Sequence, residues 1–115
     1  KKVKLRNFTS HEVVVFLADG TEIRFPSEGT ARVEVYGEPC NETICGVPVL
    51  SRRAKYGEVS GLPEPEQGTM FIVSLVMGMA LRGSRDDLLV PATDPANVIR
   101  TPDGKIVGVR ALRHG

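Results

Sequence analysis

The strongest constraint on the fold is an apolar run from Met70 to Leu81 in a chain of 115 residues. At about 12 residues the run is too short to span a bilayer, which takes about 20 apolar residues in a helix. It must therefore lie inside a folded domain, covered by other parts of the chain. Its first residues, Met70–Ser74, are β-rich, and we interpret them as a central strand.

Leu75–Arg82 is interpreted as a short helix. Ser74 suits the N-cap position, and Gly83 suits the position at which a helix stops. Because the segment is apolar on every side, we expect the helix to be covered on all sides. Gly78 costs about 1 kcal/mol relative to alanine inside a helix, so it predicts that another backbone passes close by.

A β-hairpin is the clearest local pattern. Two β-rich runs, Val13–Leu17 and Glu22–Phe25, flank Asp19-Gly20, a residue pair typical of tight hairpin turns. The first run has no polar residue, which predicts a strand covered on both faces. Residues 31–36 alternate between apolar and polar types, so we expect a half-buried strand with the odd-numbered residues directed inward.

Further strands are predicted at residues 3–6, 97–100 and 105–111, the last two joined by a turn at 101–104. Residues 46–63 are interpreted as one long strand or a bent pair, following a loop that holds both cysteines. Two prolines make residues 61–68 an extended connector. Most connections are too short for parallel crossovers. The sequence therefore predicts a single compact α+β domain over residues 1–115, with a mostly antiparallel sheet and one short apolar helix.

Composition limits the classes of partner. The net charge is +1, from 15 Lys and Arg against 14 Asp and Glu. The chain therefore lacks the excess of basic residues found in proteins that bind duplex nucleic acid. The first residues have no apolar core of the kind found in signal peptides, and no segment is long enough for a membrane span. We therefore expect a cytoplasmic protein that binds neither duplex nucleic acid nor a membrane.

Residues suited to catalysis or metal binding are sparse. Cys40 and Cys45 are the two cysteines and His11 and His114 the two histidines, too few and too scattered for a zinc site. Spacing alone allows a small disulfide loop, but two reduced thiols fit a cytosolic protein better. His11 either orients a ligand or fixes a local turn. Nucleophile and phosphate-loop motifs are absent, so we expect a protein that is not an enzyme, with no catalytic residue, metal or cofactor.

Polar residues follow the apolar run directly and form a candidate ligand surface: Arg82, Arg85, Asp86, Asp87, Thr93, Asp94, Asn97 and Arg100. Arginine binds phosphates in a two-point manner, and carboxylates accept hydrogen bonds from ribose hydroxyls. This set fits a nucleotide-like ligand. A simpler interpretation is that Arg85 and Asp87 pair with each other at the end of the helix. Arg52 and Arg53 form a second basic cluster, either a further binding site or solvated surface.

Several segments together resemble a known family: LRNFTSHEVVVFLADG, GTARV, KYGEVSGLPEPEQGTMFIVS, RDDLLVP and DGKIVGVRAL. They cover nearly the whole chain, which is similar to a widespread family of small phage, prophage and bacterial proteins. Some members are anti-Thoeris sponge proteins, which sequester the cyclic ADP-ribose-type signal of the bacterial Thoeris defence system. The most specific part comprises GLPEP and GTMFIVS. FTSH stands where the family has LTPH, and Thr101 takes the place of an aspartate.

The resemblance implies a non-catalytic binding protein that sequesters a cyclic nucleotide immune signal and so blocks Thoeris defence in the host bacterial cytoplasm. It implies homo-oligomers with pockets between protomers, in which arginines bind the diphosphate and an aromatic or aliphatic face stacks on the adenine. By position, the ligand-binding residues are Phe71, Arg85, Asp87, Asn97 and Arg100, with Phe71 as the stacking residue. The alternative is a small protein–protein interaction module or phage accessory protein without a nucleotide ligand.

Overall fold

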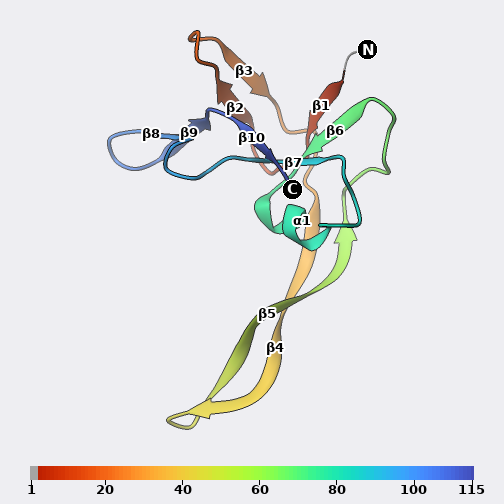
Figure 1. The fold of residues 1–115 in the computed structure, drawn as a ribbon, viewed down its shortest axis with the longest axis vertical. Coiled ribbons are helices and arrows are strands. Elements are labelled where there is room, and N and C mark those ends of the chain that lie inside the picture. Colours follow the sequence, from red (N-terminus) through yellow and green to blue (C-terminus); the bar gives the residue numbers. More distant parts are fainter. Residues whose placement is uncertain (1–2) are drawn as a thin grey trace.

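Two four-stranded sheets and one two-stranded ribbon build the fold that the computed structural model describes for residues 3–115 (Figure 1). In spatial order the first sheet holds β1 (Lys4–Asn7), β6 (Thr69–Ile72), β7 (Leu88–Pro91) and β10 (Leu112–His114). The second holds β3 (Glu22–Phe25), β2 (Val13–Phe16), β9 (Ile106–Val109) and β8 (Val98–Arg100). The ribbon consists of β4 (Arg32–Ile44) and β5 (Val47–Ser60), and the helix α1 is Leu75–Ala80.

Antiparallel pairs outnumber parallel ones, which confirms the expected fold class. The pairs β2–β3, β4–β5, β8–β9 and β7–β10 are antiparallel, whereas β1–β6, β6–β7 and β2–β9 are parallel. The β6–β7 pair uses α1 as its crossover, which is the usual connection between parallel neighbours. The protein is thus an α+β domain with a minor helical part, and its three parallel pairs were not expected.

The first sheet is covered on both faces. Consecutive residues of β6 point to opposite faces, and each face packs against another part of the protein. Phe71 packs with Met77 of α1 on one side, next to the base of the ribbon. Ile72 lies on the other side, against Val15 and Val109 of the second sheet. The prediction of a central strand is confirmed, since β6 lies between β1 and β7 and both Phe71 and Ile72 are 0% exposed.

The predicted hairpin forms as β2 and β3, with its turn at residues 17–21. Val13, Val14 and Val15 are 4%, 7% and 6% exposed, which confirms a strand covered on both faces. Leu17, which the sequence placed in the same strand, lies beyond its end and is exposed. The buried part of this apolar run is therefore limited to the residues of β2.

The helix begins where the sequence predicts, but it is shorter and less covered than expected. Ser74 is its N-cap, and the Ser74 Oγ accepts a hydrogen bond from the backbone N–H of Met77. The helix ends at Ala80, earlier than predicted. The expectation of cover on every side is wrong, because Leu75 and Met79 are 57% and 49% exposed. Only the side that carries Met77 faces the core.

Gly78 is the point at which α1 meets β7 and the last residue of the chain. A Cβ at this position would lie 2.9 Å from Val90 Cγ1 and 3.2 Å from Gly115 Cα. The first of these distances is shorter than real Cβ contacts allow. The predicted close approach of another backbone is therefore confirmed, and it fixes the height at which α1 lies on the first sheet.

β4 and β5 form a long ribbon, here called the arm, that projects from the rest of the molecule (Figure 1). The expected cysteine loop is instead strand as far as Ile44, followed by the two-residue turn Cys45-Gly46, whose φ angles are 51° and 79°. Positive φ at both turn positions matches the right-handed twist of a hairpin. The expected half-buried alternation holds only at the base, since Ala31 is 6% and Val35 49% exposed.

The C-terminal third contains two strands more than expected. β8 and β9 correspond to the predicted pair, and their turn is closed by a hydrogen bond from the Gly104 N–H to the Thr101 carbonyl. β7 and β10 are too short for a periodic pattern to mark them, and β7 owes its place to pairing with β6. Residues 61–68, here called the connector, contain no strand or helix, as predicted.

Candidate functional site

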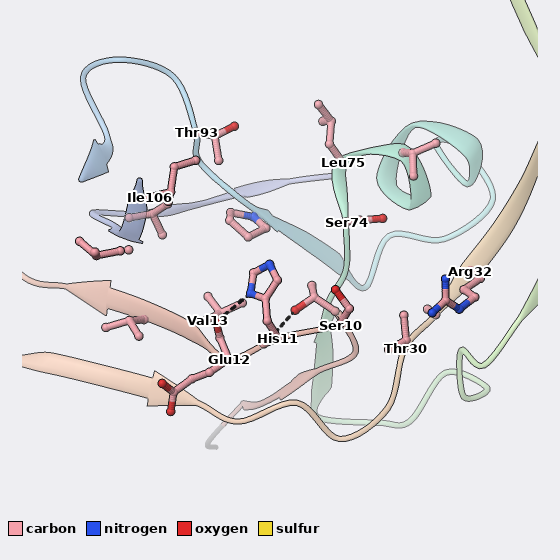
Figure 2. A pocket seen from close by; sticks show the side chains of 18 of the residues that line it. Ser10, His11, Glu12, Val13, Thr30, Arg32, Ser74, Leu75, Thr93 and Ile106 are labelled. Carbon is pink, nitrogen blue, oxygen red and sulfur yellow. Dashed lines mark hydrogen bonds between the residues drawn. The ribbon is translucent and has the colours of Figure 1, made fainter. Parts of the chain in front are cut away.

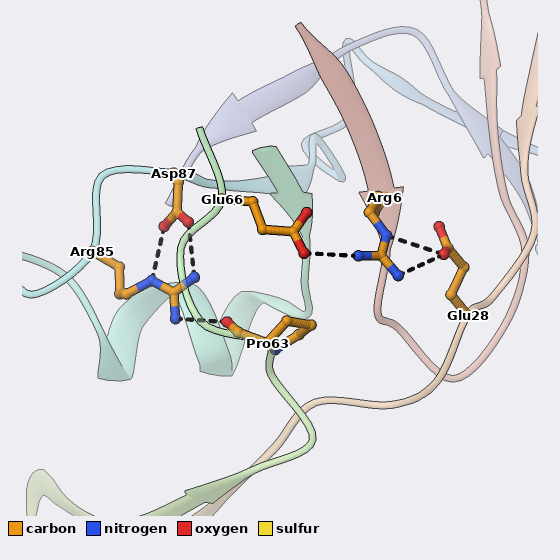
Figure 3. Close-up of polar contacts among 6 residues, drawn as sticks. All are labelled: Arg6, Glu28, Pro63, Glu66, Arg85 and Asp87. Atoms are coloured by element: carbon orange, nitrogen blue, oxygen red, sulfur yellow. Dashed lines mark hydrogen bonds and ion pairs between the residues drawn. The ribbon is translucent and has the colours of Figure 1, made fainter. Parts of the chain in front are cut away.

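Arg85 is held in a closed polar cluster with Asp87 and Pro63 (Figure 3). Its Nε and Nη2 donate to the two carboxylate oxygens of Asp87 at 2.9 and 2.8 Å, and its Nη1 donates to the Pro63 carbonyl at 3.1 Å. The two charged side chains are 15% and 14% exposed. The cluster connects the segment after α1 to the connector, and the hydrogen bonds of the Arg85 guanidinium go to groups of the protein itself.

The charges of this pair support each other. The hydrogen bond from Arg85 holds the pKa of the Asp87 carboxyl below its ordinary value, although partial burial acts in the opposite direction. The same hydrogen bond raises the pKa of the Arg85 guanidinium. Both groups are therefore charged at neutral pH, and the simpler interpretation from the sequence, that they pair with each other, describes their geometry.

Phe71 lies beneath Arg85, whose guanidinium carbon is 5.8 Å from the ring centroid. Its ring also meets the Phe8 ring edge to face, with centroids 5.7 Å apart. Because Phe71 is 0% exposed in the central strand, it presents no free face to a nucleobase. The stacking role that the resemblance implies has no accessible surface at this position.

Asn97 and Arg100 lie elsewhere, beside β8 in the second sheet. The Asn97 Nδ2 donates to the Asp94 carboxylate at 2.9 Å, and the Arg100 Nη1 donates to the Gly104 carbonyl at 2.7 Å. Both side chains thus support their own loops. Within residues 3–115 no hydrogen bond or ion pair joins them to the Arg85 cluster. The structure brings together three of the five predicted ligand residues and leaves these two apart.

The other positions singled out by the sequence are exposed. Arg82 lies just after α1, and Arg52 and Arg53 lie on β5 in the arm. Cys40 in β4 and Cys45 in the arm's turn are both free thiols. Since the arm separates them along its length, they do not form the small loop that their spacing allowed.

A cavity of about 620 Å³ opens between the start of α1, the second sheet and the base of the arm (Figure 2). Small-molecule sites have volumes of about 300 to 1,000 Å³, so it can hold such a ligand. Its apolar walls include Val13, Val14, Leu75, Val76, Ile106 and Val107. Its polar groups include Ser10, His11, Thr30, Arg32, Ser74 and Thr93.

Arg32 is the cationic group of this cavity. It is the first residue of β4, it is exposed, and its guanidinium makes no ion pair with the residues that the structure describes. The carboxylate among the lining residues, Glu12, is bound to Arg24 at 3.0 Å. The cavity therefore offers an uncommitted guanidinium near several hydroxyls, and such a group binds phosphate or carboxylate in a two-point manner.

A buried asparagine shapes the polar rim of the cavity. Asn7 is 1% exposed, and its Nδ2 donates to the carbonyls of His11 at 2.9 Å and Phe25 at 2.7 Å. Its Oδ1 accepts from the backbone N–H and the hydroxyl of Thr9, at 2.9 and 2.7 Å. The His11 carbonyl is thus held in a fixed turn, while its ring, whose Nδ1 lies 2.9 Å from the Glu12 carbonyl, lines the cavity.

Sequence reasoning did not identify this cavity as the site. Arg32 lies on the polar side of an alternating strand, where an arginine is ordinarily just exposed. Only the packing of distant segments brings it to the same cavity as Ser74 and Thr93. One signal was present: FTSH and GTARV, two segments of the resemblance, both contribute residues to this cavity.

Apolar walls, hydroxyls and one guanidinium are groups that bind a ligand by contact, hydrogen bonding and charge. Within residues 3–115, no three His, Cys, Asp or Glu side chains gather as ligands for a metal ion. The part of the chain that the structure describes also has no helix both long and apolar enough to cross a membrane. Comparisons with models of protein families, with curated proteins and with solved structures found no match to this chain.

Proposed function

We propose that the protein is a non-catalytic binding protein that captures a cyclic nucleotide signal of the cyclic ADP-ribose type and thereby blocks Thoeris defence. The observation that carries the proposal is the combination of apolar walls and the uncommitted Arg32 in a cavity of about 620 Å³. A ligand of this class has a flat base, hydroxyl-bearing riboses and an anionic diphosphate. The cavity holds a group suited to each of these parts.

The sequence resemblance supports the ligand class because several of its segments supply residues to this cavity. FTSH supplies Ser10 and His11 to the cavity, and GTARV supplies Thr30 and Arg32. In the most specific part, GLPEP has a different role, since the Pro63 carbonyl accepts a hydrogen bond from Arg85, whereas GTMFIVS supplies Ser74 to the cavity. In this proposal Arg32 takes the phosphate-binding role, whereas the Arg85 cluster holds the framework.

Sequestration makes a demand on affinity. A nanomolar dissociation constant corresponds to about 12 kcal/mol, and a small ligand reaches it only when most of its surface is buried. His11, Glu12 and Arg32 are all exposed at the cavity rim, so one protomer leaves the site partly open. The oligomer that the resemblance implies, with pockets between protomers, would supply the missing cover.

Titration calorimetry with cyclic ADP-ribose isomers tests the proposal. We expect saturable binding and recovery of the intact ligand after denaturation. Arg32→Ala should raise the dissociation constant about 10- to 100-fold, because a hydrogen bond to a charged group contributes about 1.5 to 3 kcal/mol. Arg82→Ala, which removes an exposed arginine outside the cavity, is the matched control and should change nothing.

Other outcomes of the same titration contradict the proposal. No heat with any isomer would end it, and conversion of the ligand would show an enzyme instead. Arg100→Ala, measured in parallel, tests the position that the resemblance implies. A loss of affinity in Arg100→Ala but not in Arg32→Ala would move the site to the loop beside β8.

A protein-interaction module is the second candidate, favoured by the exposed apolar side chains of the arm. A module of this kind would bind its partner protein without any contribution from Arg32. Equal binding of a purified partner by the wild type and Arg32→Ala, together with no response to cyclic nucleotides, would favour this candidate over ligand capture.

A further inference from the structure

The backbone and the ring of His11 are held by different contacts. The His11 carbonyl accepts hydrogen bonds from the Asn7 Nδ2 at 2.9 Å and from the Thr9 hydroxyl at 2.8 Å. Asn7 and Thr9 are 1% and 7% exposed, so a buried polar network fixes the turn through the backbone of His11. The ring takes no part in that network and lies exposed among the residues that line the cavity. Any role of the ring therefore belongs to the cavity.

One nitrogen of the ring is fixed by a local bond. The His11 Nδ1 lies 2.9 Å from the Glu12 carbonyl oxygen. A neutral imidazole carries a single proton, and a carbonyl oxygen can only accept a hydrogen bond. The contact therefore places the proton on Nδ1 and leaves Nε2 with a free lone pair. In this tautomer the Nε2 of His11 is a hydrogen-bond acceptor.

The second nitrogen is directed into the cavity. Figure 2 shows the His11 ring between the second sheet and the start of α1, with one nitrogen bonded to the backbone and the other on the side away from that bond. Within residues 3–115 the Nε2 makes no hydrogen bond. A rotation of the ring that removed Nε2 from the cavity would also break the bond of Nδ1. The backbone contact thus sets both the tautomer and the direction of the ring.

The cavity holds few side-chain groups that accept a hydrogen bond and cannot donate one. The Glu12 carboxylate is one of them, but Arg24 engages it at 3.0 Å. The hydroxyl groups of the lining residues can both donate and accept, and the guanidinium of Arg32 can only donate. The His11 Nε2 is therefore an acceptor left free for a ligand, on a cavity whose free charge is a donor.

We propose that the His11 Nε2 accepts a hydrogen bond from a ribose hydroxyl of the bound nucleotide, which makes the cavity selective for ligands that carry this hydroxyl. The inference rests on the proposed function, in which Arg32 binds the phosphates. An ionised phosphate oxygen can only accept, so it cannot satisfy a bare ring nitrogen. Arg32 and His11 therefore take different parts of the ligand, and together they fix its orientation.

The place of the ring favours the ribose over the base as the donor. His11 stands at a polar end of the lining, where its neighbours Ser10 and Glu12 are exposed, whereas the following Val13 and Val14 are buried. The flat base is the least polar part of a nucleotide and gains most from apolar walls. The ribose carries the hydroxyls and links the base to the phosphates. An amino group on the base is the competing donor, and the binding experiment separates the two.

The tautomer can be tested on the full chain without any ligand. Long-range ¹H–¹⁵N correlation spectra at pH 8, which favours the neutral ring, distinguish a protonated ring nitrogen from a bare one. We expect His11 in the form with the proton on Nδ1. The chain has two histidines, so the spectrum of His114→Gln assigns the signals. A His11 ring with its proton mainly on Nε2 would overturn the inference.

Two substitutions separate the two ring nitrogens in a binding assay. Asparagine can place an amide nitrogen near the position of Nδ1, whereas glutamine reaches toward the position of Nε2 with an oxygen that accepts. In titration calorimetry with cyclic ADP-ribose isomers at pH 8, His11→Asn should raise the dissociation constant about 3- to 10-fold, the effect of one uncharged hydrogen bond. His11→Gln should lose less. His114→Asn is the matched control, the same change at a histidine outside this cavity, and should bind as the wild type does.

A modified ligand identifies the donor. Isomers that lack one ribose hydroxyl should include one that the wild type binds as weakly as His11→Asn binds the parent ligand. For that isomer His11→Asn should cause no further loss, because the two changes remove the same hydrogen bond. If the losses add for every deoxyribose isomer, the hydroxyl is not the donor. Coupling of His11→Asn to a modified amino group on the base would likewise overturn the assignment to the ribose.

The outcomes separate this inference from the proposed function. No binding of any isomer by the wild type would end the proposed function, and the assignment of the hydroxyl with it. Equal affinity of the wild type and His11→Asn would end the inference about His11 alone, and so would equal losses in His11→Asn and His114→Asn. We expect His11→Asn to keep the urea midpoint of the wild type, because the turn is held through the backbone. If the variant does not fold, the spectra and the deoxyribose isomers on the wild type decide.

Discussion

Arg85 and Asp87 form a two-point ion pair, with bonds of 2.9 and 2.8 Å, directly beside the buried ring of Phe71. A third bond from Arg85 reaches the Pro63 carbonyl in the connector. The pair therefore links the segment after α1, the connector and the central strand. These bonds give a structural role to two of the polar residues that follow the apolar run, because Arg85 and Asp87 hold the end of that run against the connector.

Replacing Arg85 by alanine should destabilise the fold. The change leaves the largely buried Asp87 carboxylate without its partner, and we expect a loss of about 2 to 4 kcal/mol in the free energy of unfolding. Urea denaturation at pH 7 measures this loss. Arg82→Ala, an exposed arginine on the same segment, should change the value by less than about 0.5 kcal/mol. Similar losses in both variants would contradict the structural role of the pair.

Acid should remove the contribution of the same pair. Because the pKa of Asp87 is lowered in the fold, its ionised form contributes stability that is present above the ordinary carboxyl range. That stability is lost as the pH falls through the lowered value. The difference in unfolding free energy between the wild type and Asp87→Asn should thus be largest near pH 7 and shrink as the pH falls below the ordinary carboxyl range. A difference that stays constant from neutral to acid pH would show that ionisation of Asp87 has no part in stability.

Asn7 should be among the polar residues most important for stability. Asn7→Leu keeps a similar volume but leaves the His11 and Phe25 carbonyls and the Thr9 N–H without the bonds that Asn7 makes. We expect a loss of about 2 to 4 kcal/mol, measured by chemical denaturation. The control is Ser10→Ala, an exposed residue of the same turn, with an expected change below about 0.5 kcal/mol.

Gly78→Ala should destabilise the protein although alanine is the better helix former. The propensity gain is about 1 kcal/mol, but the new Cβ would lie 2.9 Å from Val90 Cγ1 and 3.2 Å from Gly115 Cα. We expect a net loss of about 1 to 3 kcal/mol from overpacking. Val90→Ala opens part of this space, so the double variant should lose less than the sum of the two single losses. If the losses of the two single variants simply add in the double variant, the contact between residue 78 and Val90 is not the cause of the destabilisation.

Oxidation should not close a disulfide within one chain. Cys40 lies in β4 and Cys45 in the turn, five residues apart and thus about 16 Å at strand rise. A disulfide needs Cα atoms within about 7 Å. Mass spectrometry after mild oxidation should show two free thiols per monomer, or cross-linked dimers at high concentration. A monomer lighter by two hydrogens would show that the arm rearranges.

Local patterns in the sequence predicted those elements whose stability is local. The hairpin of β2 and β3 follows from Asp19-Gly20 between two β-rich runs, and the start of α1 follows from Ser74 at the N-cap. The close contact at Gly78 was also predictable, because a helix rarely keeps a glycine without a packing reason. The hairpin and the start of the helix depend on residues only a few positions apart, whereas the contact at Gly78 is made with Val90 and Gly115.

The errors arose where the outcome depends on distant neighbours. The half-buried alternation from Ala31 fails after Val33 because the arm leaves the core, and no local pattern records that departure. The outer face of α1 is uncovered for the same kind of reason. Asn97 and Arg100 were grouped with Arg85 by sequence distance, although β8 belongs to the second sheet and the Arg85 cluster borders the first.

The amino-acid sequence by itself determined the fold class, the central apolar strand, the hairpin and the limits of the helix to within a few residues, because periodicity, turn residues and caps act over short range. Only the tertiary structure decided that Arg85 is engaged by Asp87, that Phe71 is inaccessible, and that Arg32 stands uncommitted at a cavity. The physical reason is that a side chain becomes available for binding only after all its alternative partners have been placed, and those partners come from remote segments.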